Sequence, residues 1–198
     1  MNAGRSLVIG CGALARELVN LTCQLPNVEV ACLPATLHNR PGGIPGAVRD
    51  RIAKARADGF ERIFVAYADC GTGGLLDRLL AEEGIERLPG AHCYEFYAGS
   101  AAFVQLVSEE IGTFYLTDFL VRNFHRLVIR GLGIDRHPEL LATYFANYVR
   151  VVYLAQTTDD DLRDAARRAA TTLGLSFEYR YTGLGGLADS IVAFGGAA

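Results

Sequence analysis

The sequence has no long block of like charge, and its formal net charge is only −3 over 198 residues. Electrostatic binding to nucleic acid or to an anionic membrane usually needs a basic patch, so the composition argues against both partners. No apolar run is long enough to span a membrane, and glycines and charges interrupt the amino-terminal stretch, which does not fit a signal peptide. We therefore expect a cytoplasmic protein of ordinary globular composition.

The five cysteines include no CxxC pair. An odd number without an export signal argues against a disulfide framework, so we expect reduced thiols that are available for chemistry. Cys23, in a predicted helix, and Cys32, in a predicted strand, are best interpreted as small buried hydrophobes. Cys11, Cys70 and Cys93 need a separate explanation.

Apolar runs that fit strands alternate with helical patterns along most of the chain. The predicted strands begin near residues 6, 28, 62, 85, 150 and 176, and closely spaced helical stretches fill residues 100–149. This order predicts an α/β fold, a three-layer sandwich with a mainly parallel sheet. We expect a single domain over residues 1–198, with a helical insert at about 100–149.

Three cysteines follow three predicted strands. Cys11 follows the first strand, Cys70 the third and Cys93 the fourth, each close to a glycine. The carboxyl ends of parallel strands share one edge of a sheet, where ligands bind, so the three thiols are expected to converge. Cys11 and Cys70 also precede helices, whose dipoles favour thiolate. Taken singly, each could still be a packed hydrophobe, and Cys70 or Cys93 could be a lone nucleophile with a histidine as base.

A shared site of three thiolates would suit zinc or a [4Fe-4S] cluster with one open position. His38, His92 and Glu95 are candidates for that position, and His38 or Glu95 could instead move a proton. Asp69 would orient a neighbouring group or cap a turn. The sequence leaves zinc and iron-sulfur undecided.

The glycines permit a different interpretation. Gly10 and Gly12 in "GCGALA" fit part of a dinucleotide fingerprint, and Gly71 and Gly73 in "DCGTGG" could present amides to a phosphate. A nucleotide- or S-adenosylmethionine-binding Rossmann-like enzyme is therefore an alternative. The second strand ends without the acidic residue that holds a ribose, which ranks this alternative lower.

The stretches "LHNRPGGI", "YADCGTGG" and "LPGAHCYEFYAG" resemble an uncharacterised bacterial and archaeal domain-of-unknown-function family. The resemblance covers nearly the whole chain and carries over onto His38, Asp69, Cys70, Gly71 and Cys93, and more loosely onto Cys11. Members are often encoded near corrinoid-dependent methyltransferases, which implies one-carbon metabolism.

Together these observations predict a metal or cluster protein, an enzyme with transferase- or lyase-like chemistry on a small soft substrate that carries a thiol, sulfur or methyl group. The alternative of another class is a non-catalytic accessory protein that docks a corrinoid protein or methyltransferase through the aromatic insert. The aromatic residues there also fit core packing or a homo-oligomer.

Overall fold

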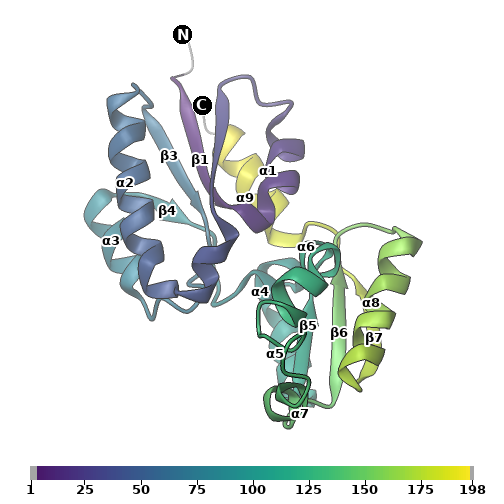
Figure 1. The fold of residues 1–198 in the computed structure, drawn as a ribbon. Coiled ribbons are helices and arrows are strands. Elements are labelled where there is room, and N and C mark those ends of the chain that lie inside the picture. Colours follow the sequence, from purple (N-terminus) through teal and green to yellow (C-terminus); the bar gives the residue numbers. More distant parts are fainter. Residues whose placement is uncertain (1–3, 197–198) are drawn as a thin grey trace. The chain divides into compact units, whose positions relative to one another are not determined.

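The computed structural model describes residues 4–196, whose strands form two separate sheets (Figure 1). Every strand pairing in both sheets is parallel, which confirms the predicted α/β class with parallel strands. The chain divides into two compact units. Unit 1 extends to Phe96 and resumes at Leu184, and unit 2 comprises Tyr97–Gly183.

Unit 1 is a three-layer sandwich around a sheet with the order β2-β1-β3-β4. Its strands are β1 (Ser6–Cys11), β2 (Val28–Leu33), β3 (Arg62–Ala66) and β4 (Glu86–Arg87). One face is covered by helices α1 (Ala15–Thr22) and α9 (Gly185–Gly196), and the other by α2 (Ile44–Ala57) and α3 (Leu75–Glu83) (Figure 1). Short helical segments complete it: η1 (Gly12–Leu14), η2 (Ala35–Asn39), η3 (Pro41–Gly43) and the start of α4 (Cys93–Ala98).

The middle strands of this sheet are apolar because helices cover them on both faces. All six residues of β1 are buried, and so are Phe64, Val65 and Ala66 of β3. Such strands give continuous apolar runs in the sequence instead of an alternating pattern. From β1 the chain passes outward to β2 and then crosses back to β3, so the strand order reverses between β1 and β3. The carboxyl ends of these two strands therefore flank the crevice where open α/β sheets bind ligands.

Unit 2 has a three-stranded sheet with the order β5-β6-β7. Its strands are β5 (Thr113–Leu116), β6 (Arg150–Ala155) and β7 (Ser176–Tyr181), and its helical segments are α5 (Ser100–Glu109), α6 (Asp118–Arg122), the π-helical turn η4 (His125–Ile129), α7 (Leu140–Phe145) and α8 (Asp160–Leu173). Asp159 caps the start of α8, since its carboxylate accepts a hydrogen bond from the Leu162 amide at 3.2 Å.

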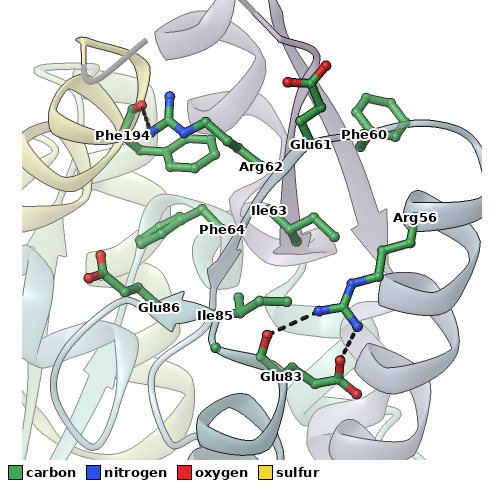
Figure 2. Close-up of a pocket in the computed structure, with 11 residues that line it drawn as sticks. Arg56, Phe60, Glu61, Arg62, Ile63, Phe64, Glu83, Ile85, Glu86 and Phe194 are labelled. Atoms are coloured by element: carbon green, nitrogen blue, oxygen red, sulfur yellow. Dashed lines mark hydrogen bonds and ion pairs between the residues drawn. The ribbon is translucent and has the colours of Figure 1, made fainter.

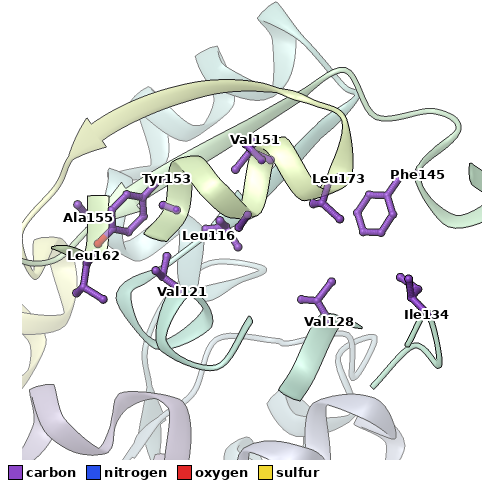
Figure 3. Packing of buried hydrophobic residues seen from close by; sticks show 13 residues of the cluster. Leu116, Val121, Val128, Ile134, Phe145, Val151, Tyr153, Ala155, Leu162 and Leu173 are labelled. Atoms are coloured by element: carbon purple, nitrogen blue, oxygen red, sulfur yellow. The ribbon is translucent and has the colours of Figure 1, made fainter. Parts of the chain in front are cut away.

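The core of unit 2 lies between this sheet and its helices (Figure 3). Val151 and Tyr153 of β6 are fully buried, and Leu173 of α8 and Phe145 of α7 belong to the same apolar cluster. Phe114 meets both Phe145 and Tyr148 edge to face, with ring centroids 5.4 and 5.8 Å apart. Phe114, Phe145 and Tyr148 of the predicted insert thus pack inside unit 2, as the packing interpretation expected, whereas Tyr144 is exposed.

The inserted segment is larger and less helical than predicted. Residues 100–149 contain β5, and the insertion between the two parts of unit 1 is an α/β unit that continues to Gly183. Strand β5 is not predicted from the sequence, because its four residues form a short apolar run, which periodicity cannot distinguish from a helical segment. Two sheets in two compact units therefore differ from the single domain that we expected. Helix α9, absent from the prediction, returns the chain to unit 1.

Candidate metal site at the carboxyl ends of β1 and β3

Backbone hydrogen bonds hold two of the cysteine-bearing segments together. The Asp69 amide donates to the Gly90 carbonyl at 3.1 Å, and the Cys70 amide donates to the Ala91 carbonyl at 2.9 Å. Cys93 begins α4 two residues after Ala91, so this pairing fixes the turn after β3 beside the turn before α4. Cys11 is the last residue of β1, the strand adjacent to β3.

The three predicted thiols line one cavity, as their positions at the strand ends led us to expect. Its volume is about 20 Å³, and its walls come entirely from unit 1: Cys11, Ala13, Leu14, His38, Ala66, Tyr67, Ala68, Cys70, Cys93 and Phe96. A space of this size accommodates a single water molecule or ion.

The turn that carries Cys70 is conformationally strained. Cys70 has a φ of 51°, and among residues 4–196 it is the one residue other than glycine with a positive φ. A side chain in the left-handed region costs stability and often marks a functional position. The neighbouring Gly71 and Gly73 also have positive φ values, of 82° and 61°. These glycines are required by the turn that aims the Cys70 thiol.

Asp69 stabilises this turn. Its carboxylate accepts hydrogen bonds from the Thr72 hydroxyl at 2.6 Å and from the amides of Gly73 and Gly74 at 3.2 and 2.9 Å. These donors hold the pKa of the Asp69 carboxyl below its usual value. The geometry is that of the capping aspartate, one of the two roles that the sequence left open.

The cavity thiols are protonated at neutral pH in the metal-free protein, contrary to the effect of helix dipoles that we expected. Burial raises the pKa of Cys11 to about 11 and that of Cys70 to about 12, and it raises the pKa of Cys93 as well. For Cys70 and Cys93, charge on the other cavity cysteines raises the pKa further, because like charges so close together repel; for Cys11 it is charge on Cys32, outside the cavity, that does so. Desolvation therefore outweighs the dipole, which disfavours Cys70 as an unassisted nucleophile.

His38 lies beside Cys11. Its Nδ1 is 3.7 Å from the Cys11 Sγ and 3.2 Å from the Ala35 carbonyl oxygen. In one tautomer Nδ1–H donates to Ala35; in the other the Nδ1 lone pair faces the thiol. Although His38 as a whole residue is exposed, desolvation of its ring lowers the pKa, so the imidazole is neutral at pH 7 and able to bind a metal. A sulfur and a nitrogen ligand on tetrahedral zinc lie about 3.5 Å apart, close to this separation.

Tyr67 is a residue of this cavity that the sequence analysis did not select. It directly follows β3, is 1% exposed, and stacks its ring on that of His38 with centroids 6.2 Å apart. Its hydroxyl comes close enough to Cys11 to lower the pKa of that thiol, yet within residues 4–196 it has no hydrogen-bond partner of normal geometry. The one sequence signal for Tyr67 is an aromatic residue at a strand end, just before "ADCG".

Other predicted site residues have local structural roles. Glu95 does not line the cavity, and its carboxylate accepts a hydrogen bond from the Ala91 amide at 2.8 Å. A Cβ at Gly10 would lie 2.2 Å from the Cδ1 of Leu18, and one at Gly12 would lie 3.0 Å from the Leu33 carbonyl oxygen. Packing of β1 and η1 against their neighbours therefore accounts for both glycines. His92, the other candidate for the fourth ligand, is not among the cavity residues.

The remaining two cysteines are exposed, although we expected both to be buried. Cys23 lies at the end of α1, where its thiol donates to the Asn20 carbonyl at 3.0 Å, and Cys32 lies on β2, an edge strand. Across residues 4–196, no group of three or more His, Cys, Asp or Glu side chains is already arranged to hold a metal ion. Binding at the cavity therefore requires the thiols to turn toward a common centre.

A larger cavity of about 460 Å³ lies at the opposite end of β3 (Figure 2). Arg56 pairs with Glu83 there, and Arg62 donates to the Phe194 carbonyl at 2.8 Å while its guanidinium lies over the Phe194 ring. Its wall contains neither cysteine nor histidine. The cavity is large enough for a small molecule, but it lacks the nucleophiles and soft ligands of the smaller one.

Unit 2 contains a buried polar cluster around Asp118, which the sequence analysis also missed. The fully buried carboxylate accepts hydrogen bonds from the Tyr153 hydroxyl at 2.6 Å, the Gln156 amide at 3.0 Å and the Thr157 hydroxyl at 2.7 Å. Arg122 lies 3.8 Å away. Both oxygens of the Asp118 carboxylate are hydrogen-bonded, so this cluster has a structural role: it holds α6 to the end of β6.

The family model described as "Protein of unknown function (DUF1638)" matches residues 32–191. This range includes His38, Tyr67, Cys70 and Cys93 but not Cys11. No curated protein and no solved structure matches the chain. None of the helices described is both long and apolar enough to cross a membrane.

Proposed function

We propose that this chain, which belongs to the DUF1638 family, binds one soft metal ion through the thiolates of Cys11, Cys70 and Cys93. The observation that carries the proposal is that these thiols, from three separate segments, line one cavity of about 20 Å³. Soft thiolates select zinc and similar ions, and the cavity volume fits a single ion.

His38 supplies the fourth ligand in the resting protein. The neutral imidazole 3.7 Å from the Cys11 sulfur is suitably placed for that position. Unlike the cysteines, His38 is an exposed residue on the short η2 turn, so a stronger soft ligand can displace it. Three permanent ligands and one exchangeable one are typical of catalytic rather than structural zinc.

Displacement of His38 would activate a small thiol or sulfide. A metal held by Cys11, Cys70 and Cys93 would lower the pKa of a substrate sulfur, and the displaced His38 imidazole would accept the S–H proton, which leaves the substrate as a thiolate. Such a thiolate can attack the methyl carbon of a methyl-carrying donor, whose carrier leaves with the electrons of the broken bond; this fits a transferase in the one-carbon chemistry that the family resemblance implies. Because the cavity is small, only the sulfur of the substrate enters it, and the rest of the molecule stays outside.

Metal and acid-labile sulfide analysis of protein purified without oxygen tests this proposal. The wild type is expected to hold about one zinc per chain, Cys70→Ser to lose it, and Cys23→Ser, a matched change at an exposed cysteine, to keep it. Iron with sulfide would retain the thiolate site but replace the single ion by a cluster. The proposal fails if the wild type holds no metal even after incubation with zinc under reducing conditions, or if Cys70→Ser binds as well as the wild type.

A further inference from the structure

The Tyr67 hydroxyl is the unexplained polar group of the cavity. Tyr67 is 1% exposed, and in the described chain its hydroxyl forms no hydrogen bond of normal geometry. Buried hydroxyl groups are nearly always paired, because an unpaired one loses its hydrogen bonds to water without replacement. A fold that keeps this hydroxyl instead of a phenylalanine therefore needs a state in which the group has a partner.

The neighbouring sulfur can become that partner. Cys11 and Tyr67 line the same cavity of about 20 Å³, and the Cys11 sulfur already accepts a hydrogen bond from the Ala13 amide at 3.3 Å. A neutral thiol is a weak acceptor, whereas a thiolate accepts strong, charge-assisted hydrogen bonds. Metal binding converts the first into the second.

We propose that Tyr67 is a positioning residue that donates its O–H to the Cys11 thiolate when the metal is bound. This inference rests on the proposed function. It assigns to Cys11 two donors, the Ala13 amide and the Tyr67 hydroxyl, which hold the sulfur in place and draw electron density from it. His38, whose Nδ1 lies 3.7 Å from the Cys11 sulfur, also stacks its ring on that of Tyr67, so the proposed donor and the proposed fourth ligand are packed against each other.

Two effects of opposite direction follow for Tyr67→Phe. The metal-free variant should be at least as thermally stable as the wild type, because the change removes a buried hydroxyl that has no partner. Its metal affinity should fall about 10- to 100-fold, as is usual when a group that orients a metal ligand is lost. A hydroxyl with only a structural role would lower stability and leave affinity unchanged.

Cobalt(II), which takes the tetrahedral geometry of zinc and absorbs visible light, is the probe for this test. Wild type, Tyr67→Phe and the exposed control Tyr181→Phe are titrated with Co²⁺ under reducing conditions, and thermal unfolding is followed without metal. In Tyr67→Phe the sulfur-to-cobalt charge-transfer band is expected to move to longer wavelength, since the sulfur lone pairs lose a hydrogen bond, and the Co²⁺ affinity to fall at least 10-fold. Tyr181→Phe should behave as wild type.

The outcomes separate the two proposals. If the wild type binds Co²⁺ through thiolates and Tyr67→Phe binds it equally well with an unshifted band, the role of Tyr67 is refuted and the metal site stands. If Tyr67→Phe fails to fold, the hydroxyl is structural and the inference is again refuted. If the folded wild type gives no charge-transfer band, the metal site itself is refuted, and the role of Tyr67 with it.

Discussion

Binding of one zinc ion at pH 7 should release three protons. The pKa values of Cys11 and Cys70, about 11 and 12, and the raised pKa of Cys93 keep all three thiols protonated, while the lowered pKa of His38 keeps its ring neutral. Each thiol therefore loses one proton on binding and the imidazole loses none. Since the released protons compete with the metal, the apparent zinc affinity should rise about 1,000-fold for each pH unit between pH 6.5 and 7.5.

Isothermal titration calorimetry in buffers with different ionisation enthalpies measures this number directly. Cys93→Ser should release two protons and bind more weakly, whereas Cys23→Ser should still release three. Fewer than two protons from the wild type would refute a site of three thiolates. An unchanged proton count in Cys93→Ser would show that this cysteine is not a ligand.

Three further predictions concern stability. Between pH 9 and pH 11, Cys11 alone should lower the free energy of unfolding of the metal-free protein by about 2–3 kcal/mol, because its pKa rises from 9.0 to about 11 on folding and the unfolded chain therefore loses that proton first. The raised pKa values of Cys70 and Cys93 add to the decline. The assignment fails if urea unfolding of Cys11→Ala shows the same decline as the wild type. Asp118→Ala should lower the free energy of unfolding by about 4 kcal/mol, because it leaves buried donors without an acceptor. A decrease of less than about 1 kcal/mol would contradict this. Gly10→Ala should lower the free energy of unfolding by about 1–3 kcal/mol, since the added methyl group would overlap the buried Leu18 side chain. The methyl group added by Gly46→Ala has no atom within 4 Å, so this variant should show no loss of stability in the same assay.

Local sequence signals predicted much of unit 1. Continuous apolar runs identified β1 and β3, because both faces of these strands are buried. The division into two sheets was not predictable in this way, since strand pairing depends on contacts between distant residues. A run such as β5, four residues between helices, is identified as a strand only by its pairing with β6.

At the candidate site too, the features set by local sequence were predictable, and those set by the packing of distant residues were not. The position of Cys11 and Cys70 at strand ends predicted that they converge, because parallel strands share an edge. The protonation of these thiols was predicted incorrectly, since the depth of burial depends on the packing around them. Tyr67 was missed because an unpaired hydroxyl is a property of three-dimensional surroundings and leaves no pattern in the sequence.

The left-handed backbone of Cys70 has a consequence for selection. At a φ of 51° a glycine would fold with less strain, so stability alone favours Cys70→Gly over the natural residue. A library of variants sorted only for folded protein should therefore accumulate glycine at this position. A library sorted for activity should retain cysteine. The difference in the frequency of cysteine at position 70 between the two libraries would measure how strongly function, as opposed to stability, selects for the Cys70 sulfur.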